Sequence, residues 1–222
     1  MSTVEIVGSR RGVDWGRVAM VPLMTLLLIG NVIGMAGAAE RATDPVAVGA
    51  SVLASAATGL FLAMIVVAYL RRSAARVTTP SWWARLASIA ATFMPLVAAP
   101  VFGVSSRPGA DLLAAALVIV GTAWSLWSLS ALGTNLSIFA QTRALADTGP
   151  YRWVRHPLYV GEIVAMAGLV VRSEMGAAVG AWLLLIGLQA FRAMHEERLL
   201  EATLPGYLDY QSRTARLVPG VF

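Results

Sequence analysis

Long apolar runs separated by short polar segments dominate the chain. The runs at 18–39, 47–70, 85–104 and 112–132 are close to the roughly 20 residues that a helix needs to cross a bilayer core. A shorter run at 158–171 is followed, after Arg172, Ser173 and Glu174, by a sixth at 175–191. The pattern predicts an all-α, polytopic transmembrane helical bundle with about five to six membrane segments, of which the last two form a helical hairpin.

Composition supports a membrane protein and excludes several other classes. Hydrophobic residues make up 58% of the chain and charged residues only 13%, whereas a soluble domain has about a quarter of its residues charged. The net charge of +5 comes from Arg alone, so we read it as a topology signal and expect no nucleic-acid partner. The chain has no Cys, which excludes disulfides, thiolate metal sites and cysteine nucleophiles.

The distribution of Arg predicts which loops face the cytoplasm. Arg residues gather before the first run and after the second, fourth and sixth runs, while the other loops hold only Arg41, Arg107 and Arg172. Under the positive-inside rule, both termini and the polar clusters after the fourth and sixth runs are then cytoplasmic. The Arg-rich, Lys-free composition is typical of a bacterial chain, so we expect it in the bacterial inner (plasma) membrane.

The chain is expected to form one domain with two functional parts. Residues 1–132 form the N-terminal transmembrane scaffold, and residues 133–222 form a catalytic region with a cytoplasmic loop, the hairpin and a C-terminal tail. Within the scaffold, small residues at spacing four, such as Gly30 and Gly34, predict close approach of neighbouring helices.

The first polar cluster lies where a loop meets the fifth apolar run. Gly149-Pro150 predicts a turn, and Pro157 suits the first turn of a helix, which puts His156 at its N-cap. A helix N-terminus flanked by Arg152 and Arg155 is suited to bind a carboxylate or phosphate. The alternative is that the Arg residues are topology anchors and His156 is an interfacial residue.

Glu162 lies inside the fifth apolar run. A carboxylate at membrane depth is costly and tends to mark a functional site. The alternative is that Glu162 only pairs with an Arg of the cytoplasmic layer.

The second polar cluster extends from Arg192 to Arg216. Arg192 and Glu196 are one helical turn apart, which predicts a helix leaving the membrane, and Pro205-Gly206 predicts its end. Taken alone, the segment is typical of an amphipathic helix on an anionic membrane surface. Two His without Cys make a poor metal site, and the Walker, Rossmann and serine-hydrolase motifs are absent, so we expect neither a metal nor those chemistries.

Two groups of polar, aromatic and Gly or Pro residues flank the predicted hairpin, and their order and spacing form a recognisable pattern. They are Leu132-Gly133 with Asn135, Gly149 to Arg152 and Arg155 to Gly161 before it, and Glu196 to Leu200, Gly206-Tyr207, Tyr210, Arg213 and Pro219 after it. At this spacing, the chain resembles the isoprenylcysteine carboxyl methyltransferase-like family of integral membrane methyltransferases, which includes phospholipid methyltransferase relatives. Ala215 departs from the family pattern, in which a Pro often follows Thr214.

The resemblance implies an S-adenosyl-L-methionine-dependent methyltransferase with a cytoplasmic cofactor pocket. Its acceptor is a lipophilic molecule, with a carboxylate or another lipid group, that enters from the bilayer among the membrane lipids. The implied catalytic residues are Arg213, Glu197 and Glu162. The implied cofactor-binding residues are Tyr151, Arg155, His156, Pro157, Tyr159, Glu196, Glu197, Tyr207 and Tyr210, without a metal.

Two rival interpretations stay open. The residues from His156 to Glu162 also match the cofactor site of membrane NADPH-dependent reductases of the sterol or steroid type. The third possibility is a non-catalytic membrane adaptor that binds anionic lipid through its Arg residues.

Overall fold

The computed structural model describes residues 14–41, 45–71, 77–78, 81–101, 108–132, 141–142, 145–173 and 176–220. Within these ranges the chain forms seven α-helices, one 3₁₀ helix and a two-stranded ribbon, which confirms a helical bundle. The helices are α1 (Trp15–Arg41), α2 (Pro45–Arg71), α3 (Trp82–Val101), α4 (Pro108–Leu132), α5 (Pro157–Arg172), α6 (Gly176–Thr203) and α7 (Tyr207–Arg213), with the 3₁₀ helix η2 at Gly149–Arg152. The strands β1 (Val77–Thr78) and β2 (Gln141–Thr142) pair antiparallel.

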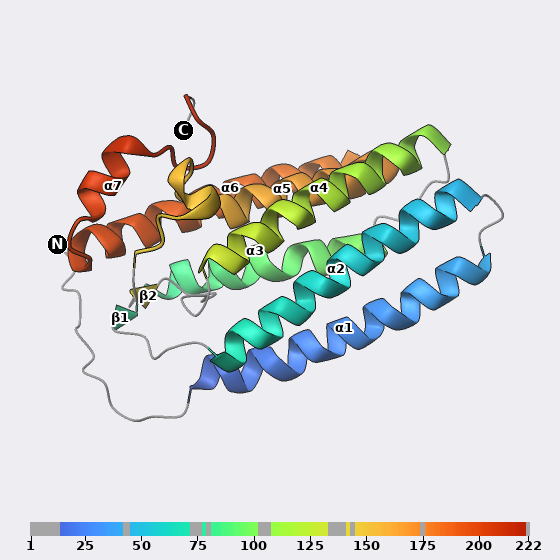
Figure 1. Ribbon diagram of the computed structural model, residues 1–222, viewed down its shortest axis with the longest axis horizontal. Helices are drawn as coiled ribbons and strands as arrows, with labels where there is room; N and C mark the ends of the chain where they lie inside the picture. The colour runs from blue at the N-terminus through green and yellow to red at the C-terminus, as the bar shows by residue number, and fades with distance from the viewer. Residues whose placement is uncertain are drawn as a thin grey trace.

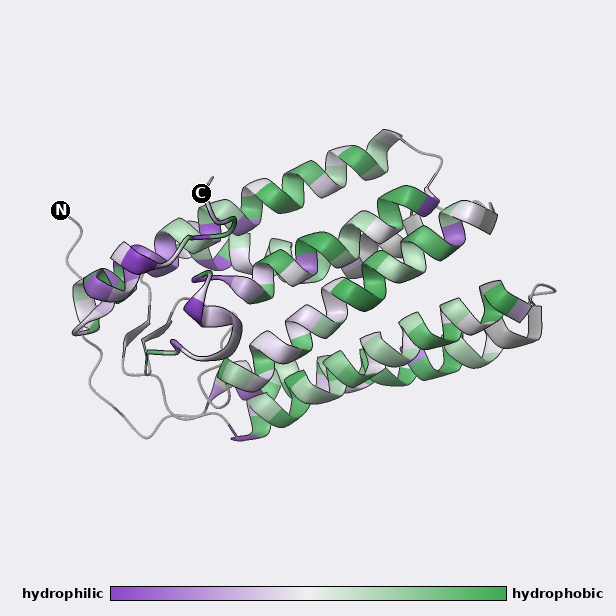
Figure 2. Cartoon of the chain, turned by 45° about the horizontal axis from the view of Figure 1, so that its top comes forward, coloured by the Kyte–Doolittle hydropathy of each residue, from purple (hydrophilic) through white to green (hydrophobic). Residues whose placement is uncertain are grey.

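The six long helices run lengthwise, and the short elements gather at one end (Figure 1). Helix α4 contacts both α2 and α5, α5 contacts α6, and α6 contacts α3. The consecutive helices α5 and α6 pack against each other, as expected for the predicted helical hairpin. We call the end that carries η2, α7 and residues 214–220 the polar end, because hydrophilic residues are concentrated there (Figure 2).

The bundle exposes apolar side chains where a soluble protein would expose polar ones. Leu26, Ile33 and Val120 are each more than 60% exposed. Four helices are long and apolar enough to cross a membrane, over Gly16–Gly37, Val48–Arg71, Gly109–Leu132 and Gly176–Thr203. These findings confirm an integral membrane protein and four of the predicted segments, while membrane crossing by α3 and α5 stays a prediction.

A tight glycine contact joins α4 to α5. A Cβ added at Gly121 would lie 2.6 Å from the Gly161 carbonyl oxygen, and a Cβ added at Gly161 would lie 2.7 Å from the Gly121 carbonyl oxygen. Further along, a Cβ at Gly168 would lie 2.6 Å from the Ala114 carbonyl oxygen. The absence of side chains therefore lets the two backbones touch, which fixes α5 against the scaffold.

The close approach predicted at Gly30 and Gly34 is wrong. A Cβ at either position would have no neighbour within 4 Å among the described residues, so these glycines do not bring the described helices together. Spacing alone does not show which side of α1 faces a neighbouring helix, and these positions face away from α2.

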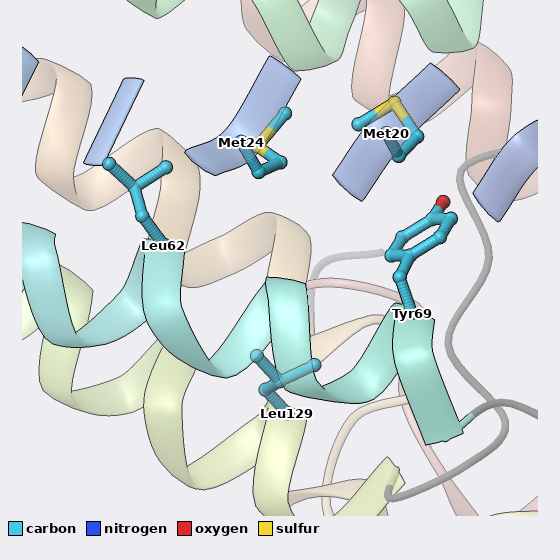
Figure 3. Packing of buried hydrophobic residues seen from close by; sticks show 5 residues of the cluster. All are labelled: Met20, Met24, Leu62, Tyr69 and Leu129. Atoms are coloured by element: carbon cyan, nitrogen blue, oxygen red, sulfur yellow. The ribbon is translucent and has the colours of Figure 1, made fainter. Parts of the chain in front are cut away.

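The scaffold is held by an apolar cluster between α1, α2 and α4. Met20 and Met24 of α1 lie against Leu62 and Tyr69 of α2, and Leu129 of α4 completes the cluster (Figure 3). Since Leu129 lies near the C-terminal end of α4, this cluster supports the part of α4 from which the polar end extends.

Candidate active site

The turn before α5 is held against α4. Gly149 has a φ of +58°, which favours glycine, and a Cβ there would lie 3.0 Å from the Ala131 Cβ. The Trp124 indole N–H donates to the Pro157 carbonyl at 2.9 Å. These contacts place the first polar cluster at the end of α4.

His156 and Pro157 begin α5 as predicted. His156 is the N-cap residue and Pro157 is the first helical residue. The His156 ring stacks on the Tyr159 ring, with the centroids 5.1 Å apart and the planes 14° from parallel. Both side chains are buried, so the start of α5 lies inside the polar end rather than on its surface.

Backbone hydrogen bonds join the C-terminal tail to the residues before α5. Val154 and Ala215 form a parallel β-bridge, and the Arg155 N–H donates to the Ala215 carbonyl at 2.8 Å. The Ala215 N–H donates to the Trp153 carbonyl at 3.2 Å. A Pro at position 215 would have no N–H to donate. The departure from the family pattern at Ala215 therefore allows this hydrogen bond to Trp153.

Glu197 binds three basic side chains that come from two separate segments. Its Oε1 accepts from Arg155 Nε at 2.7 Å and lies 3.2 Å from His156 Nε2, while its Oε2 accepts from Arg216 Nε at 2.8 Å. The Glu197 side chain is only 2% exposed. A buried carboxylate with both oxygens bonded to cations joins α6, the start of α5 and the tail into one unit.

Arg155 extends this unit to the end of α7. Its guanidinium donates to the carbonyls of Gln211 and Thr214 as well as to Glu197. The side chain therefore satisfies backbone carbonyls that the end of α7 leaves without helical partners.

Glu196 makes a separate set of contacts. Its Oε1 accepts from Arg192 Nε at 3.2 Å, and its Oε2 lies 3.7 Å from His156 Nδ1, which is too long for a hydrogen bond. The Arg192 guanidinium lies over the Tyr159 ring, 4.6 Å from its centroid. Glu196 is 16% exposed in its side chain, against 2% for Glu197, and so is the more accessible carboxylate.

Glu162 lies deeper in the bundle and contacts Gln189. The Gln189 side-chain amide donates to Glu162 Oε2, and Arg192 interacts electrostatically with the same carboxylate. Because Arg192 also donates to Glu196, it connects the two carboxylates, while an ion pair between Glu162 and an Arg stays a prediction.

Three buried tyrosines support the tail. The Tyr210 hydroxyl donates to the Tyr151 carbonyl at 2.7 Å, and the rings of Tyr207 and Tyr210 lie 5.9 Å apart. The Tyr207 hydroxyl is buried without a hydrogen-bond partner among the described residues. Burial raises the pKa of all three phenols above the ordinary value, so they stay neutral over the physiological range.

The structure brings most of the predicted site residues to one place but leaves one apart. Arg155, His156, Pro157, Tyr159, Glu196 and Glu197 form one connected group, with Tyr151, Tyr207 and Tyr210 beside it and Glu162 below it. Arg213 points outward instead, 61% exposed and paired with Asp209 at 3.6 Å. Gly133 and Asn135, quoted for the resemblance, lie outside the described residues.

Three residues of this group were not predicted as site residues. They are Arg216, Arg192 and Gln189, which contact Glu197, Glu196 and Glu162. The spacing of Arg192 and Glu196 indicated their pairing. Nothing in the sequence indicated that Arg216 pairs with Glu197. Gln189 could have been singled out by one signal, because it places a polar amide inside an apolar run.

The chemistry of the polar side chains in this group fits S-adenosyl-L-methionine. An accessible carboxylate at Glu196 suits an ammonium, His156 suits a carboxylate, and the unpartnered Tyr207 hydroxyl can bond a further polar group. Glu197 has no free oxygen for a ligand. Among the described residues, no group of three or more His, Asp or Glu side chains is arranged to hold a metal ion.

Comparison with known proteins points to the same part of the chain. Residues 110–204 match the phospholipid methyltransferase family, a range that includes α4, α5 and α6 with His156, Glu196 and Glu197. A similar protein is the cobalt-zinc-cadmium resistance protein CzcN of Cupriavidus metallidurans, 28% identical over 109 residues, which are 49% of this chain and 47% of that protein. The chain thus spans about half the length of the curated relative it matches. The region from α4 to α6 is therefore similar to the phospholipid methyltransferases.

Proposed function

We propose that the protein is an S-adenosyl-L-methionine-dependent methyltransferase that acts on a lipophilic acceptor at the cytoplasmic face of the membrane. One observation carries the proposal: the range that matches the phospholipid methyltransferase family contains His156, Glu196 and Glu197, which meet in the structure. When bound, the cofactor supplies a methyl group on a sulfonium, which passes to a lone pair of the acceptor while the C–S electron pair stays on sulfur.

The two neighbouring carboxylates have different roles in this proposal. Glu196, whose side chain is 16% exposed, binds the cofactor ammonium. Glu197 is a positioning residue, because both of its oxygens hold basic side chains, those of Arg155, His156 and Arg216, in place. The chain thereby fixes the groups around the methyl donor before the acceptor arrives, and such alignment supplies much of the rate enhancement in a displacement reaction.

The acceptor reaches the site from the bilayer and the cofactor from water. The polar end combines hydrophilic residues with the ends of four helices able to cross the membrane, so a ligand at this level can contact both phases. The Arg distribution favours a cytoplasmic location for this end.

Calorimetric titration of the detergent-solubilised protein with S-adenosylhomocysteine tests the cofactor. We expect saturable binding, weakened about tenfold or more by Glu196→Gln, because a hydrogen bond to a charged group is worth about 1.5–3 kcal/mol. Glu201→Gln is the matched control, because Glu201 is exposed on the same helix and contacts Gln211 instead. Binding of NADPH without S-adenosylhomocysteine would favour the reductase, and binding of neither would favour the adaptor.

Methyl transfer is tested separately. Membranes containing the protein are incubated with S-adenosyl-L-methionine that carries a tritiated methyl group, and lipid extracts are counted. Label in the lipid fraction is expected from the wild type and not from Glu196→Gln. A labelled product, distinct from the cofactor, that is found only in the aqueous fraction would overturn the lipophilic acceptor.

A further inference from the structure

A second polar contact lies below the candidate active site, within the apolar part of α5 and α6. It joins Glu162 of α5 to Gln189 of α6. Gln189 precedes Glu196 by two helical turns, or about 10 Å along the axis. Its side chain is fully buried, with 0% exposure, and its chain neighbours Leu188 and Ala190 are apolar.

This pair has hydrogen-bonding capacity that the described residues do not use. The Gln189 amide nitrogen donates to Glu162, but Gln189 Oε1 is buried without a partner among the described residues. Leaving a buried polar atom unbonded costs about 1–3 kcal/mol, and polar groups at membrane depth tend to be functional. Two apolar side chains would fill this space without that cost.

The pair is connected to the candidate active site. Arg192 lies one turn beyond Gln189 on α6, interacts electrostatically with Glu162 and donates to Glu196. A row of polar side chains thus runs from His156 and Glu196 through Arg192 to Glu162 and Gln189. A group bound at Glu162 would lie on the membrane side of a ligand bound at Glu196.

We propose that Glu162 and Gln189 form a polar subsite for the head group of the methyl acceptor, and that Gln189 is the positioning residue that holds Glu162 in it. This inference rests on the proposed function. The unused atom, Gln189 Oε1, is a hydrogen-bond acceptor, and Glu162 in its ionised form also only accepts. The subsite therefore takes a head group that donates an O–H or N–H and rejects a carboxylate.

Three amphiphiles with the same chain and different head groups test this preference. Octadecanol, octadecylamine and octadecanoic acid are titrated into the solubilised protein in the presence of S-adenosylhomocysteine, and apparent affinities are taken from thermal unfolding. We expect the alcohol and the amine to bind about tenfold more tightly than the acid, as the loss of one hydrogen bond to a charged group implies.

Variants of Gln189 and Glu162 test whether these two residues cause the head-group preference. Gln189→Met keeps the size of the side chain and should remove the preference, while Gln211→Met makes the same change at a surface Gln that contacts Glu201 and should keep it. Glu162→Gln can still accept from Gln189 but carries no negative charge, so it should keep the affinity for the alcohol and bind the ammonium less tightly than the wild type does. If Gln189→Met is too unstable to measure, Glu162→Gln alone decides.

The outcomes separate the subsite from the proposed function. The subsite is overturned if the acid binds as tightly as the alcohol, or if Gln189→Met and Glu162→Gln keep the wild-type order of the three head groups. Calorimetry with S-adenosylhomocysteine should give the same affinity for Gln189→Met and the wild type. If the wild type does not bind S-adenosylhomocysteine, the proposed function fails, whichever amphiphile binds.

Discussion

Arg155 Nε lies 2.7 Å from Glu197 Oε1, although the two residues are 42 positions apart in the chain. This contact, together with those of His156 and Arg216, closes the polar end by joining α6 to the start of α5 and to the tail. It also means that the polar end depends on one carboxylate.

Glu197→Gln is therefore expected to destabilise the protein strongly. The change leaves buried Arg155 without its charged partner, and loss of one member of a buried ion pair costs about 3–5 kcal/mol. Thermal unfolding in detergent should show a large decrease in Tm, and limited proteolysis should cleave the tail faster. Glu201→Gln should behave like the wild type in both measurements. A Glu197→Gln protein with the Tm and cleavage rate of Glu201→Gln would contradict the role given to Glu197.

The contact between α4 and α5 gives a prediction about packing. Gly161→Ala places a Cβ against the Gly121 carbonyl oxygen, and overpacking of this kind costs about 1–3 kcal/mol. Gly180→Ala is the control, because a Cβ there has no neighbour within 4 Å and Ala is favoured over Gly in a helix by about 1 kcal/mol. Thermal unfolding should move in opposite directions for the two variants, and a Gly161→Ala protein as stable as the wild type would contradict the close approach.

Arg213 and Arg216 are three residues apart but should differ in effect. Arg216→Ala removes a hydrogen bond to buried Glu197, so it should lower both Tm and affinity for S-adenosylhomocysteine. Arg213→Ala removes only an exposed pair with Asp209, and such pairs contribute about 0–1 kcal/mol. Arg213→Ala should therefore keep Tm and cofactor affinity. Any loss of methyl transfer in Arg213→Ala would support the catalytic role that the family resemblance implies for Arg213.

The buried phenols predict a loss of stability at alkaline pH. The pKa of Tyr151, Tyr207 and Tyr210 is raised by burial above its ordinary value of about 10, so the unfolded chain releases these protons before the folded chain does. Their contribution to stability is complete below about pH 10 and falls as the pH rises further.

Ultraviolet absorbance of tyrosinate measures this directly. Absorbance should stay low above pH 10 until the protein unfolds, whereas denatured protein should titrate near the ordinary value. Tyr207→Phe should unfold at a higher pH than the wild type and should not be less stable at neutral pH, because its hydroxyl has no partner. Normal titration of all the phenols in the folded protein would show that they are not buried.

Much of this arrangement could be predicted from local signals. Pro157 predicted the start of α5 and made His156 its N-cap, because Pro fits the first turn of a helix. Pro205-Gly206 predicted the end of α6, and the apolar runs predicted the long helices. Each of these predictions depends only on residues that are neighbours in the chain.

The contacts between distant segments could not be predicted in the same way. The pairing of Arg216 with Glu197 depends on a backbone bridge between Val154 and Ala215, two residues with no recognisable pairing signal. The glycines that do bring helices together, Gly121 and Gly161, lie on different helices, so no spacing within one helix indicates them. The family resemblance named Arg213, but only the fold shows that Arg216 is the tail arginine that reaches the buried carboxylate.

The glycine contact between α4 and α5 also limits how the protein can open. Where the Gly121 and Gly161 backbones touch, no acyl chain can pass between the two helices, and neither helix can slide without breaking that fit. Over this stretch α4 and α5 form one stationary wall. A lipophilic acceptor that enters from the bilayer, as we propose, therefore does not pass between α4 and α5 over this stretch.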